Sequence, residues 1–214
     1  MRDEMAITVK NLYKQFNKET VLTNINLELE KGHIYGLVGR NGSGKSILFK
    51  CIVGLLNATS GQIIVNNKTI GKGQLPEGMG VLLDKPGFLL HYTGFQNLKL
   101  LASINDKITD EEIKEAISIV GLNPASKQIV RKYSLGMKQR LGLAQAIMEK
   151  PDIIILDEPM NGLDEDGVED IRELLLDLKR KGKTIFLSSH NSEDINRLCD
   201  TVFLIKNGQL VKNV

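Results

Sequence analysis

The first third of the chain alternates between apolar and polar residues over short runs, and this pattern predicts an antiparallel sheet. Residues 6–12 form a first apolar-rich run, and in residues 25–29 Ile and Leu alternate with Asn and Glu. A period of two residues is typical of a strand with one buried face and one face in water. Residues 62–65, followed by the turn residues Asn66 and Asn67, predict further antiparallel sheet.

Continuous apolar runs indicate a second kind of strand. These runs are too short for helices, and strands buried on both faces have this composition. They cover residues 34–38, 80–83, 153–156 and 184–188. Because helical patterns alternate with them, the sequence predicts an α/β fold built on a parallel sheet.

Apolar residues at helical spacing predict the helices. Thr109 and Glu112 have the spacing of a capping box, and Pro151 ends a helix over residues 135–149. The remaining segments are helices over residues 47–53, 97–104, 167–181 and 191–199, and a closing hairpin at residues 207–208. The middle of the chain, about residues 87–150, is therefore predicted to be a helical segment between two strand-rich halves.

Composition sets wide bounds on function. A chain of 214 residues forms one large domain, or one domain with a small appended lobe. The net charge of +2 gives no sign of a nucleic-acid partner. Cys51 and Cys199 lie far apart in the sequence, which favours reduced thiols in a cytosolic protein. Residues 1–5 lack the apolar segment of a signal peptide, and no run approaches the length of a membrane span, so we expect another chain to supply any membrane span.

Residues 39–46 carry the strongest chemical signal, because they match the phosphate-binding pattern G-x-x-x-x-G-K-[ST] between a predicted strand and a predicted helix. Glycines allow backbone N–H groups to approach phosphate oxygens. Lys45 is expected to reach the β- and γ-phosphates and to serve catalysis, and the Ser46 hydroxyl is expected to ligate Mg²⁺. The nucleotide-binding residues of this segment are predicted to be Gly39, Asn41, Gly42, Ser43, Gly44, Lys45, Ser46 and Ile47. The chain is predicted to bind a nucleoside triphosphate.

Two carboxylates follow the apolar run 153–156, at the edge of a parallel sheet where ligands bind. Asp157 is expected to hold Mg²⁺, and Glu158 to polarise the attacking water. The alternative is that both carboxylates merely end a strand in solvent. His190 follows the next apolar strand, which favours contact with the γ-phosphate, although a lone His is more often a surface or core residue.

Residues 133–140 open the third predicted helix of the middle segment, where backbone N–H groups and the helix dipole form an anion site. The alternative is an ordinary helix start with Ser134 as its N-cap.

Taken together, these motifs resemble the ATP-binding subunits of ABC transporters over essentially the whole chain. Residues 39–46 resemble the Walker A loop and residues 153–158 resemble Walker B, with Glu158 as its catalytic residue. Residues 134–140 resemble the signature motif, residues 161–164 the D-loop that contains Asp164, and His190 the switch histidine. Phe16 falls where the family places an aromatic residue under the adenine, and its alternative role is that of a core aromatic.

The resemblance implies a head-to-tail dimer, of two copies or of one copy with a related subunit, that sandwiches two ATP molecules and Mg²⁺. Ser134 and Gly136 would then contact the γ-phosphate bound by the other subunit. Residues 6–32 and about 60–75 resemble the family's antiparallel β subdomain. The segment about 87–150 resembles the helical subdomain that contacts membrane permease subunits, inserted in one ATP-binding domain over residues 1–214. The family works on the cytoplasmic face of the cell membrane.

Two departures from the family pattern refine the expectation. Leu135-Gly136-Met137 replaces the usual Gly-Gly-Gln after the signature serine. This variant resembles the branch of bacitracin-type and lantibiotic-immunity exporters, whose permeases are separate chains, so we expect export of a peptide, antibiotic or drug. Asp84 stands where the family usually has Gln, and still offers an oxygen ligand to the metal.

Two rival functions belong to other classes. A non-transport ABC ATPase, acting in DNA repair, chromosome organisation or translation, usually carries long coiled coils or two fused ATPase halves. This chain has one phosphate loop and no sustained heptads. A phosphotransferase would need an acceptor pocket and a lid, and the segment 87–150 could be mistaken for one. A GTPase usually shows Asn-Lys-x-Asp, and the sequence Asn67-Lys68-Thr69-Ile70 does not fit this motif.

Overall fold

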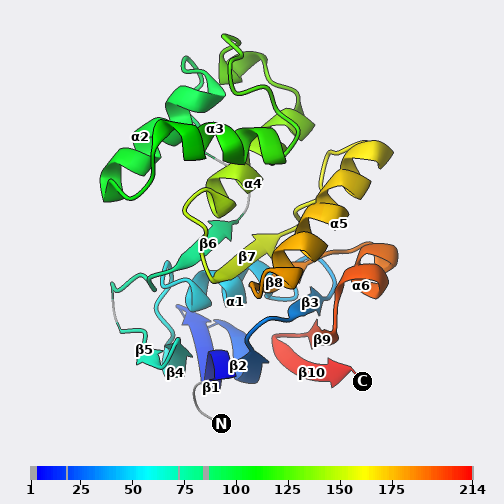
Figure 1. Ribbon diagram of the computed structural model, residues 1–214. Coiled ribbons are helices and arrows are strands. Elements are labelled where there is room, and N and C mark those ends of the chain that lie inside the picture. Colours follow the sequence, from blue (N-terminus) through cyan, green and yellow to red (C-terminus); the bar gives the residue numbers. More distant parts are fainter. Residues whose placement is uncertain (1–3, 18, 72, 84–86, 214) are drawn as a thin grey trace.

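The computed structural model describes residues 4–17, 19–71, 73–83 and 87–213. Two sheets stack in the lower half of Figure 1, and a group of helices rises above them. Among the described residues, every helix is too short or too polar to span a bilayer.

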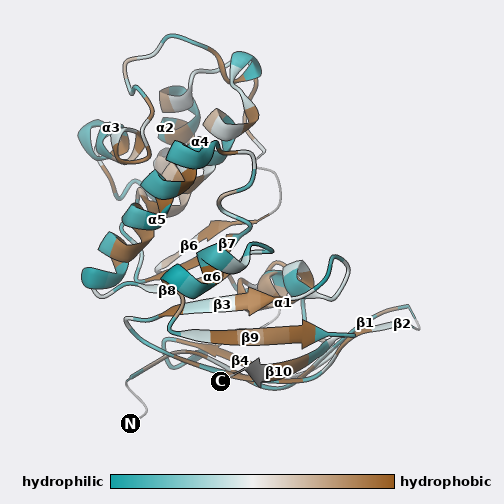
Figure 2. Cartoon of the chain, turned by 90° about the vertical axis from the view of Figure 1, so that its right-hand side faces the viewer, coloured by the Kyte–Doolittle hydropathy of each residue, from teal (hydrophilic) through white to brown (hydrophobic). Residues whose placement is uncertain are grey.

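The first sheet is antiparallel, as residues 6–12, 25–29 and 62–65 predict. Its strand order is β2-β1-β4-β5. The strands are β1 (Met5–Phe16), β2 (Glu19–Glu30), β4 (Ser60–Val65) and β5 (Lys68–Thr69). Asn66 and Asn67 both have positive φ in the two-residue turn between β4 and β5, a conformation that Asn tolerates better than most residues. The first two strands are longer than predicted and form a hairpin that projects from the body of the molecule in Figure 2.

The second sheet has the strand order β10-β9-β3-β8-β7-β6. Every pairing from β9 to β6 is parallel, and only the closing hairpin of β9 with β10 is antiparallel. The strands are β3 (Ile34–Val38), β6 (Met79–Leu82), β7 (Ile153–Asp157), β8 (Thr184–Ser188), β9 (Thr201–Lys206) and β10 (Gln209–Asn213). The predicted α/β fold with a parallel-sheet core is therefore confirmed.

Two hydrophobic clusters cover the two faces of this sheet, which explains why its strands are apolar throughout. Ile154 and Leu156 of β7 pack toward the helices, whereas Ile153 and Ile155 pack toward the antiparallel sheet. Helix α1 (Lys45–Ile52) belongs to the second cluster, and its Phe49 ring lies edge-on to Phe186 of β8 at 4.9 Å. The helix that follows the phosphate loop is thus fixed to the sheet that carries the predicted carboxylates.

The predicted helical segment is present and lies above the end of the sheet that carries β6 in Figure 1. It contains α2 (Gly94–Asn105), α3 (Asp110–Ile119) and α4 (Leu135–Ile147). The capping box of Thr109 and Glu112 is formed, as predicted. Helix α4 approaches β6 so closely that a Cβ on Gly80 would lie 1.8 Å from the Ala146 carbonyl oxygen. This contact joins the helical segment to the edge of the parallel sheet.

The predicted helix boundaries differ from the observed ones by a few residues. Helix α2 begins three residues earlier than predicted, because Thr93 and Gln96 form a capping box that the apolar pattern does not reveal. Helix α4 ends at Ile147 rather than Glu149. The last two helices are α5 (Glu165–Arg180) and α6 (Ser192–Leu198).

Burial raises the pKa of both thiols, that of Cys51 to about 11 and that of Cys199 to about 12. Both cysteines are free, as predicted, and the raised pKa keeps them protonated and unreactive.

Candidate functional site

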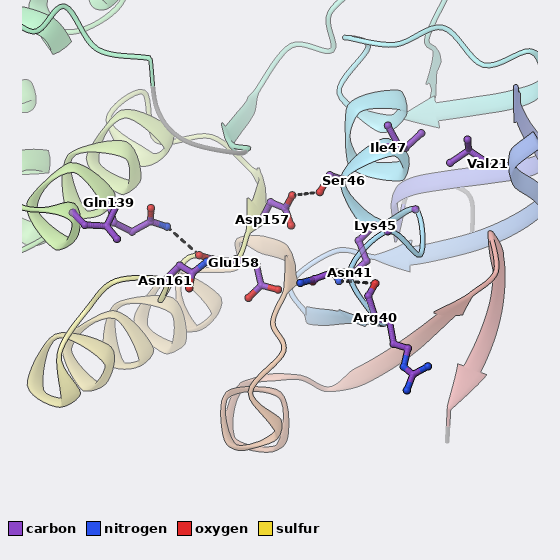
Figure 3. Close-up of a pocket in the computed structure, with 13 residues that line it drawn as sticks. Val21, Arg40, Asn41, Lys45, Ser46, Ile47, Gln139, Asp157, Glu158 and Asn161 are labelled. Atoms are coloured by element: carbon purple, nitrogen blue, oxygen red, sulfur yellow. Dashed lines mark hydrogen bonds between the residues drawn. The ribbon is translucent and has the colours of Figure 1, made fainter. Parts of the chain in front are cut away.

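A pocket of about 560 Å³ lies at the carboxyl edge of the parallel sheet, between the phosphate loop and the end of β7 (Figure 3). The residues that line it are Val21, Arg40, Asn41, Gly42, Gly44, Lys45, Ser46, Ile47, Leu135, Gln139, Asp157, Glu158 and Asn161. Seven of the predicted nucleotide- or metal-binding residues, together with the predicted catalytic Glu158, therefore meet around one cavity.

The phosphate loop turns sharply between β3 and α1. Gly42 and Gly44 both have positive φ, and Gly44 is the N-cap of α1. Gly39 does not line the pocket but supports the loop, since a Cβ there would lie 2.5 Å from the Ile205 carbonyl oxygen. Among the described residues, Ser43 has a buried hydroxyl without a hydrogen-bond partner. The loop therefore presents backbone and Lys45 to the cavity and turns Ser43 inward.

Lys45 carries a positive charge that the loop itself only partly compensates. The residue is 7% exposed, and Nζ donates to the Gly39 carbonyl oxygen at 2.7 Å and to that of Arg40 at 3.5 Å. No carboxylate of the described residues forms an ion pair with it. A buried ammonium that has only carbonyl partners favours an anion in the adjoining cavity. This charge fits a phosphate group.

Asp157 is held between two hydroxyl groups. Ser46 Oγ on α1 donates to Asp157 Oδ2 at 2.5 Å, and Ser188 Oγ on β8 donates to Asp157 Oδ1. Oxygen atoms of one carboxylate and one hydroxyl are ligands that Mg²⁺ accepts together with substrate phosphates. No group of three or more His, Cys, Asp or Glu side chains in the described part of the chain could hold a metal. The Ser46 hydroxyl and the Asp157 carboxylate are donors that fit Mg²⁺.

Glu158 occupies an unusual backbone conformation directly after β7, with φ of +51°. Its carboxylate lies at the pocket, and Oε2 is 2.8 Å from Nδ1 of His190. The His190 side chain is 70% exposed, whereas that of Glu158 is 20% exposed. The structure thus brings the predicted catalytic Glu and the predicted switch His into direct contact at the margin of the cavity.

The signature residues lie at the surface beside the pocket. Ser134 is exposed and is the N-cap of α4, with its Oγ accepting from the Met137 N–H at 3.1 Å. Gly136 lies against Gly162, because a Cβ on Gly136 would be 2.9 Å from the Gly162 carbonyl oxygen. Asp164 is the N-cap of α5. None of Ser134, Gly136 and Asp164 lines the pocket of its own chain.

Phe16 lies apart from the pocket lining, at the end of β1. Its ring is 40% exposed and has Lys14 Nζ at 4.6 Å from the ring centroid. This exposure excludes the alternative of a core aromatic. Val21 of β2 lines the cavity instead. The predicted metal ligand Asp84 lies outside the described residues.

Two polar residues that the sequence analysis missed hold the backbone of Glu158. Ser188 Oγ accepts from the Glu158 N–H at 3.0 Å, and Gln139 Nε2 donates to the carbonyl oxygens of Glu158 at 3.0 Å and Pro159 at 3.1 Å. Figure 3 shows Gln139 reaching across from α4 to this segment. A signal for Ser188 was present, because it is the polar residue that ends the apolar run 184–188. Gln139 gave no such signal, since its contact depends on the packing of α4.

Comparisons with known proteins agree with this geometry. The family model described as "ABC transporter" matches residues 22–161. An uncharacterised ABC transporter ATP-binding protein of Bacillus subtilis, YybJ, is 45% identical over 205 residues, which are 95% of this chain and 94% of that protein. The bacitracin transport ATP-binding protein BcrA of Enterococcus faecalis is 40% identical over 214 residues, or 99% of this chain and 70% of that protein.

The fold is also similar to that of solved structures. The structure of cbiO1 from Clostridium perfringens, part of the ABC transporter complex cbiONQ, superposes with a TM-score of 0.83 at 27% identity. The match covers 97% of this chain and 87% of that one.

Proposed function

The chain belongs to the ABC transporter family as an ATP-hydrolysing, ATP-binding subunit, and from that premise we propose that it drives export of a peptide, antibiotic or drug through separate membrane permease subunits. The similarity to a bacitracin transport protein and the Leu135-Gly136-Met137 signature variant support this cargo class and direction. The non-transport alternative is not favoured, because the matching family and relatives are transport ATP-binding proteins.

One observation carries the assignment of the catalytic site: the phosphate loop and both carboxylates meet around a single cavity. The cavity binds ATP, and we propose that Lys45 exchanges its loop carbonyl partners for the β- and γ-phosphate oxygens. Ser46 and Asp157 would hold Mg²⁺. When bound, Mg²⁺ neutralises charge on the β- and γ-phosphates.

The hydrolytic step depends on two side chains, Glu158 and His190. Glu158 accepts a hydrogen bond from the attacking water and polarises it toward the γ-phosphorus atom, where the bond to ADP breaks. His190, in contact with Glu158 Oε2, fixes the orientation of that carboxylate and approaches the γ-phosphate. The products are ADP and inorganic phosphate.

A head-to-tail dimer gives the surface residues a role. Ser134, Gly136 and Asp164 lie beside the cavity but do not line it. In such a dimer Ser134 and Gly136 would present backbone N–H groups, a hydroxyl and a helix dipole to the γ-phosphate of the other subunit. Phe16, exposed at the end of β1, would stack on the adenine beyond the cavity.

The helical segment supplies a surface for the permease. Five exposed apolar side chains lie within residues 89–104, and these are Leu89, Leu90, Tyr92, Leu100 and Ile104. Exposed apolar side chains mark sites of protein contact where they form one patch, so we propose that this segment contacts the permease. We place the subunit on the cytoplasmic face of the cell membrane, as one ATP-binding domain with the helical segment about 87–150 inserted in it.

Release of phosphate from Mg-ATP by the purified chain tests this proposal. Lys45→Ala is expected to lower the rate by about 10²- to 10³-fold, since it removes a charged donor to the phosphates. Lys10→Ala, which changes an exposed lysine of β1, is the matched control and should hydrolyse at the wild-type rate. Equal rates for Lys45→Ala and wild type would contradict the assigned site. Co-purification with the membrane protein encoded beside this gene tests the permease partner.

A further inference from the structure

We propose that Ser188 is a positioning residue for hydrolysis, because its single hydroxyl fixes both carboxylate residues of the site at once. This inference rests on the proposed roles of Asp157 and Glu158. Ser188 ends β8, lies directly opposite Asp157 in the parallel pairing with β7, and is completely buried. Its place is therefore set by the sheet rather than by a loop.

The hydroxyl orients the Asp157 carboxylate by occupying one of its two oxygens. Ser188 Oγ donates to Oδ1, whereas Ser46 Oγ reaches Oδ2 from the opposite side. Because Ser188 of β8 bonds Oδ1, the other oxygen, Oδ2, is directed toward Ser46. The metal would be held on the Ser46 side of the carboxylate. Without Ser188 the carboxylate could rotate about its terminal bond and present either oxygen to the cavity.

The same oxygen accepts from the Glu158 N–H at 3.0 Å. A hydroxyl can donate one hydrogen bond and accept another, so both contacts form together. Glu158 needs this support because its φ of +51° is rare for a residue with a side chain, and such a conformation persists only when neighbouring contacts hold it.

Other contacts also support Glu158, and one of them is the Asn161 N–H, which donates to its carbonyl oxygen at 3.1 Å. Gln139 holds its carbonyl oxygen, and His190, two residues after Ser188, holds its carboxylate. Of these contacts, the one from Ser188 alone also reaches the metal-binding carboxylate. Ser188 therefore couples the position of the expected Mg²⁺ to that of the group that polarises water.

Two substitutions at this position separate hydrogen bonding from packing. Ser188→Ala removes the hydroxyl, and Ser188→Cys keeps a side chain of similar size but offers only a weak donor and acceptor. Nucleotide binding is measured in EDTA and then across a Mg²⁺ titration, and kcat and KM are measured in parallel. Both variants should bind ATP in EDTA as the wild type does. Both should need about 10- to 100-fold more Mg²⁺ for half-maximal enhancement of binding, and their kcat should fall by a similar factor.

Ser189→Ala is the matched control, because its hydroxyl is also buried but bonds Asp194 and the Asn191 N–H instead. It should leave the Mg²⁺ titration unchanged. A wild-type Mg²⁺ titration in either soluble Ser188 variant would overturn the inference. If only Ser188→Ala shifted the titration, the effect would come from packing and not from the hydrogen bonds of the hydroxyl. If the wild-type protein itself showed neither Mg²⁺-dependent binding nor hydrolysis, the proposed function would fail instead.

Discussion

The wall of the pocket and the signature surface beside it are built in different ways. The wall consists of buried strand ends and a phosphate loop whose side chains already bond one another, as Ser46, Asp157 and Ser188 do. The signature surface consists of two exposed helix starts, those of α4 and α5. Within the described part of the chain, the side chains of the caps Ser134 and Asp164 bond only their own helices.

This difference indicates which part of the site depends on a partner. The charges and hydrogen bonds of the wall are arranged within one chain, so we expect the single chain to bind ATP. The signature surface presents the exposed Ser134 hydroxyl at the N-terminus of α4, where the helix dipole favours an anion. A second subunit that carries ATP would complete it. The predictions below change one region at a time and ask whether the other responds.

The largest expected effect comes from Glu158→Gln in the wall. Loss of the carboxylate should lower kcat by about 10²- to 10⁴-fold while leaving the affinity for ATP intact, because the amide keeps the shape but polarises water poorly. In the presence of Mg-ATP this variant should accumulate as a dimer in light scattering.

Glu173→Gln is the control for that experiment, since it removes an exposed carboxylate from α5. It should hydrolyse ATP normally and form no lasting dimer. Retention of wild-type turnover by Glu158→Gln would refute the catalytic role of this residue.

Ser134→Ala tests the signature surface. Turnover should fall by about 10- to 100-fold, because one donor to the γ-phosphate is lost, while the affinity of the single chain for ATP stays unchanged. The substitution also removes an N-cap, which costs about 1 kcal/mol of stability. Thr109→Ala removes the N-cap of α3 far from the site and serves as the matched control. Similar turnover in both variants would mean that Ser134 is only a cap.

Gly208→Ala tests how firmly the wall is supported from behind. The Gly208 N–H donates to the Ser43 carbonyl oxygen of the phosphate loop at 3.3 Å. A Cβ there would lie 2.2 Å from the Val21 carbonyl oxygen, and φ is +71°. Strain and overpacking together should cost about 2–5 kcal/mol in the free energy of unfolding and weaken ATP binding.

Gly182→Ala provides the comparison, because Gly182 has a φ of +80° but open space around its Cβ position. It should cost only about 1–2 kcal/mol and leave ATP binding unchanged. Urea unfolding measures both losses of stability. Equal losses for Gly208→Ala and Gly182→Ala would show that the hairpin of β9 and β10 does not support the phosphate loop.

The smallest effect is a pH dependence in the helical segment. Hydrogen bonding to Lys150 is the main cause that lowers the pKa of Glu112 from its usual 4.5 to about 2. The unfolded chain therefore binds more protons at low pH, and the stabilisation is complete above about pH 4.5 and is lost as the pH falls toward 2. Because the pair is exposed, the change should be small.

Urea unfolding of wild type and Glu112→Gln between pH 5 and pH 3 measures this effect. The wild type should lose stability more steeply with falling pH than the variant, and Glu173→Gln should follow the wild type. Parallel curves for wild type and Glu112→Gln would contradict the shifted pKa.

Much of the fold and of the wall could be predicted from the sequence, because both depend on local patterns. The apolar run 153–156 and the glycine-rich loop 39–46 each identify their own structure. The capping box of Thr109 and Glu112 could be predicted because it too is a local pattern. The start of α2 was missed because the apolar pattern begins after its cap.

Contacts between segments distant in sequence could not be predicted from the sequence. Ser188 reaches Asp157 only because β8 pairs with β7 in one register, 31 residues apart in the chain. The exposure of Phe16 and the contact of Gln139 with the segment after β7 depend likewise on tertiary packing. What the sequence lacked was the placement of supporting side chains around a motif that it identified clearly.

A crystal structure of the Glu158→Gln variant grown with ATP and Mg²⁺ tests the central claim most directly, since it measures the distance from Ser134 Oγ to the nearest γ-phosphate oxygen. We expect about 3 Å, with that ATP held by the phosphate loop of the other subunit. If Ser134 instead faced solvent, and every γ-phosphate were contacted by residues of one chain alone, the shared-site account would be wrong.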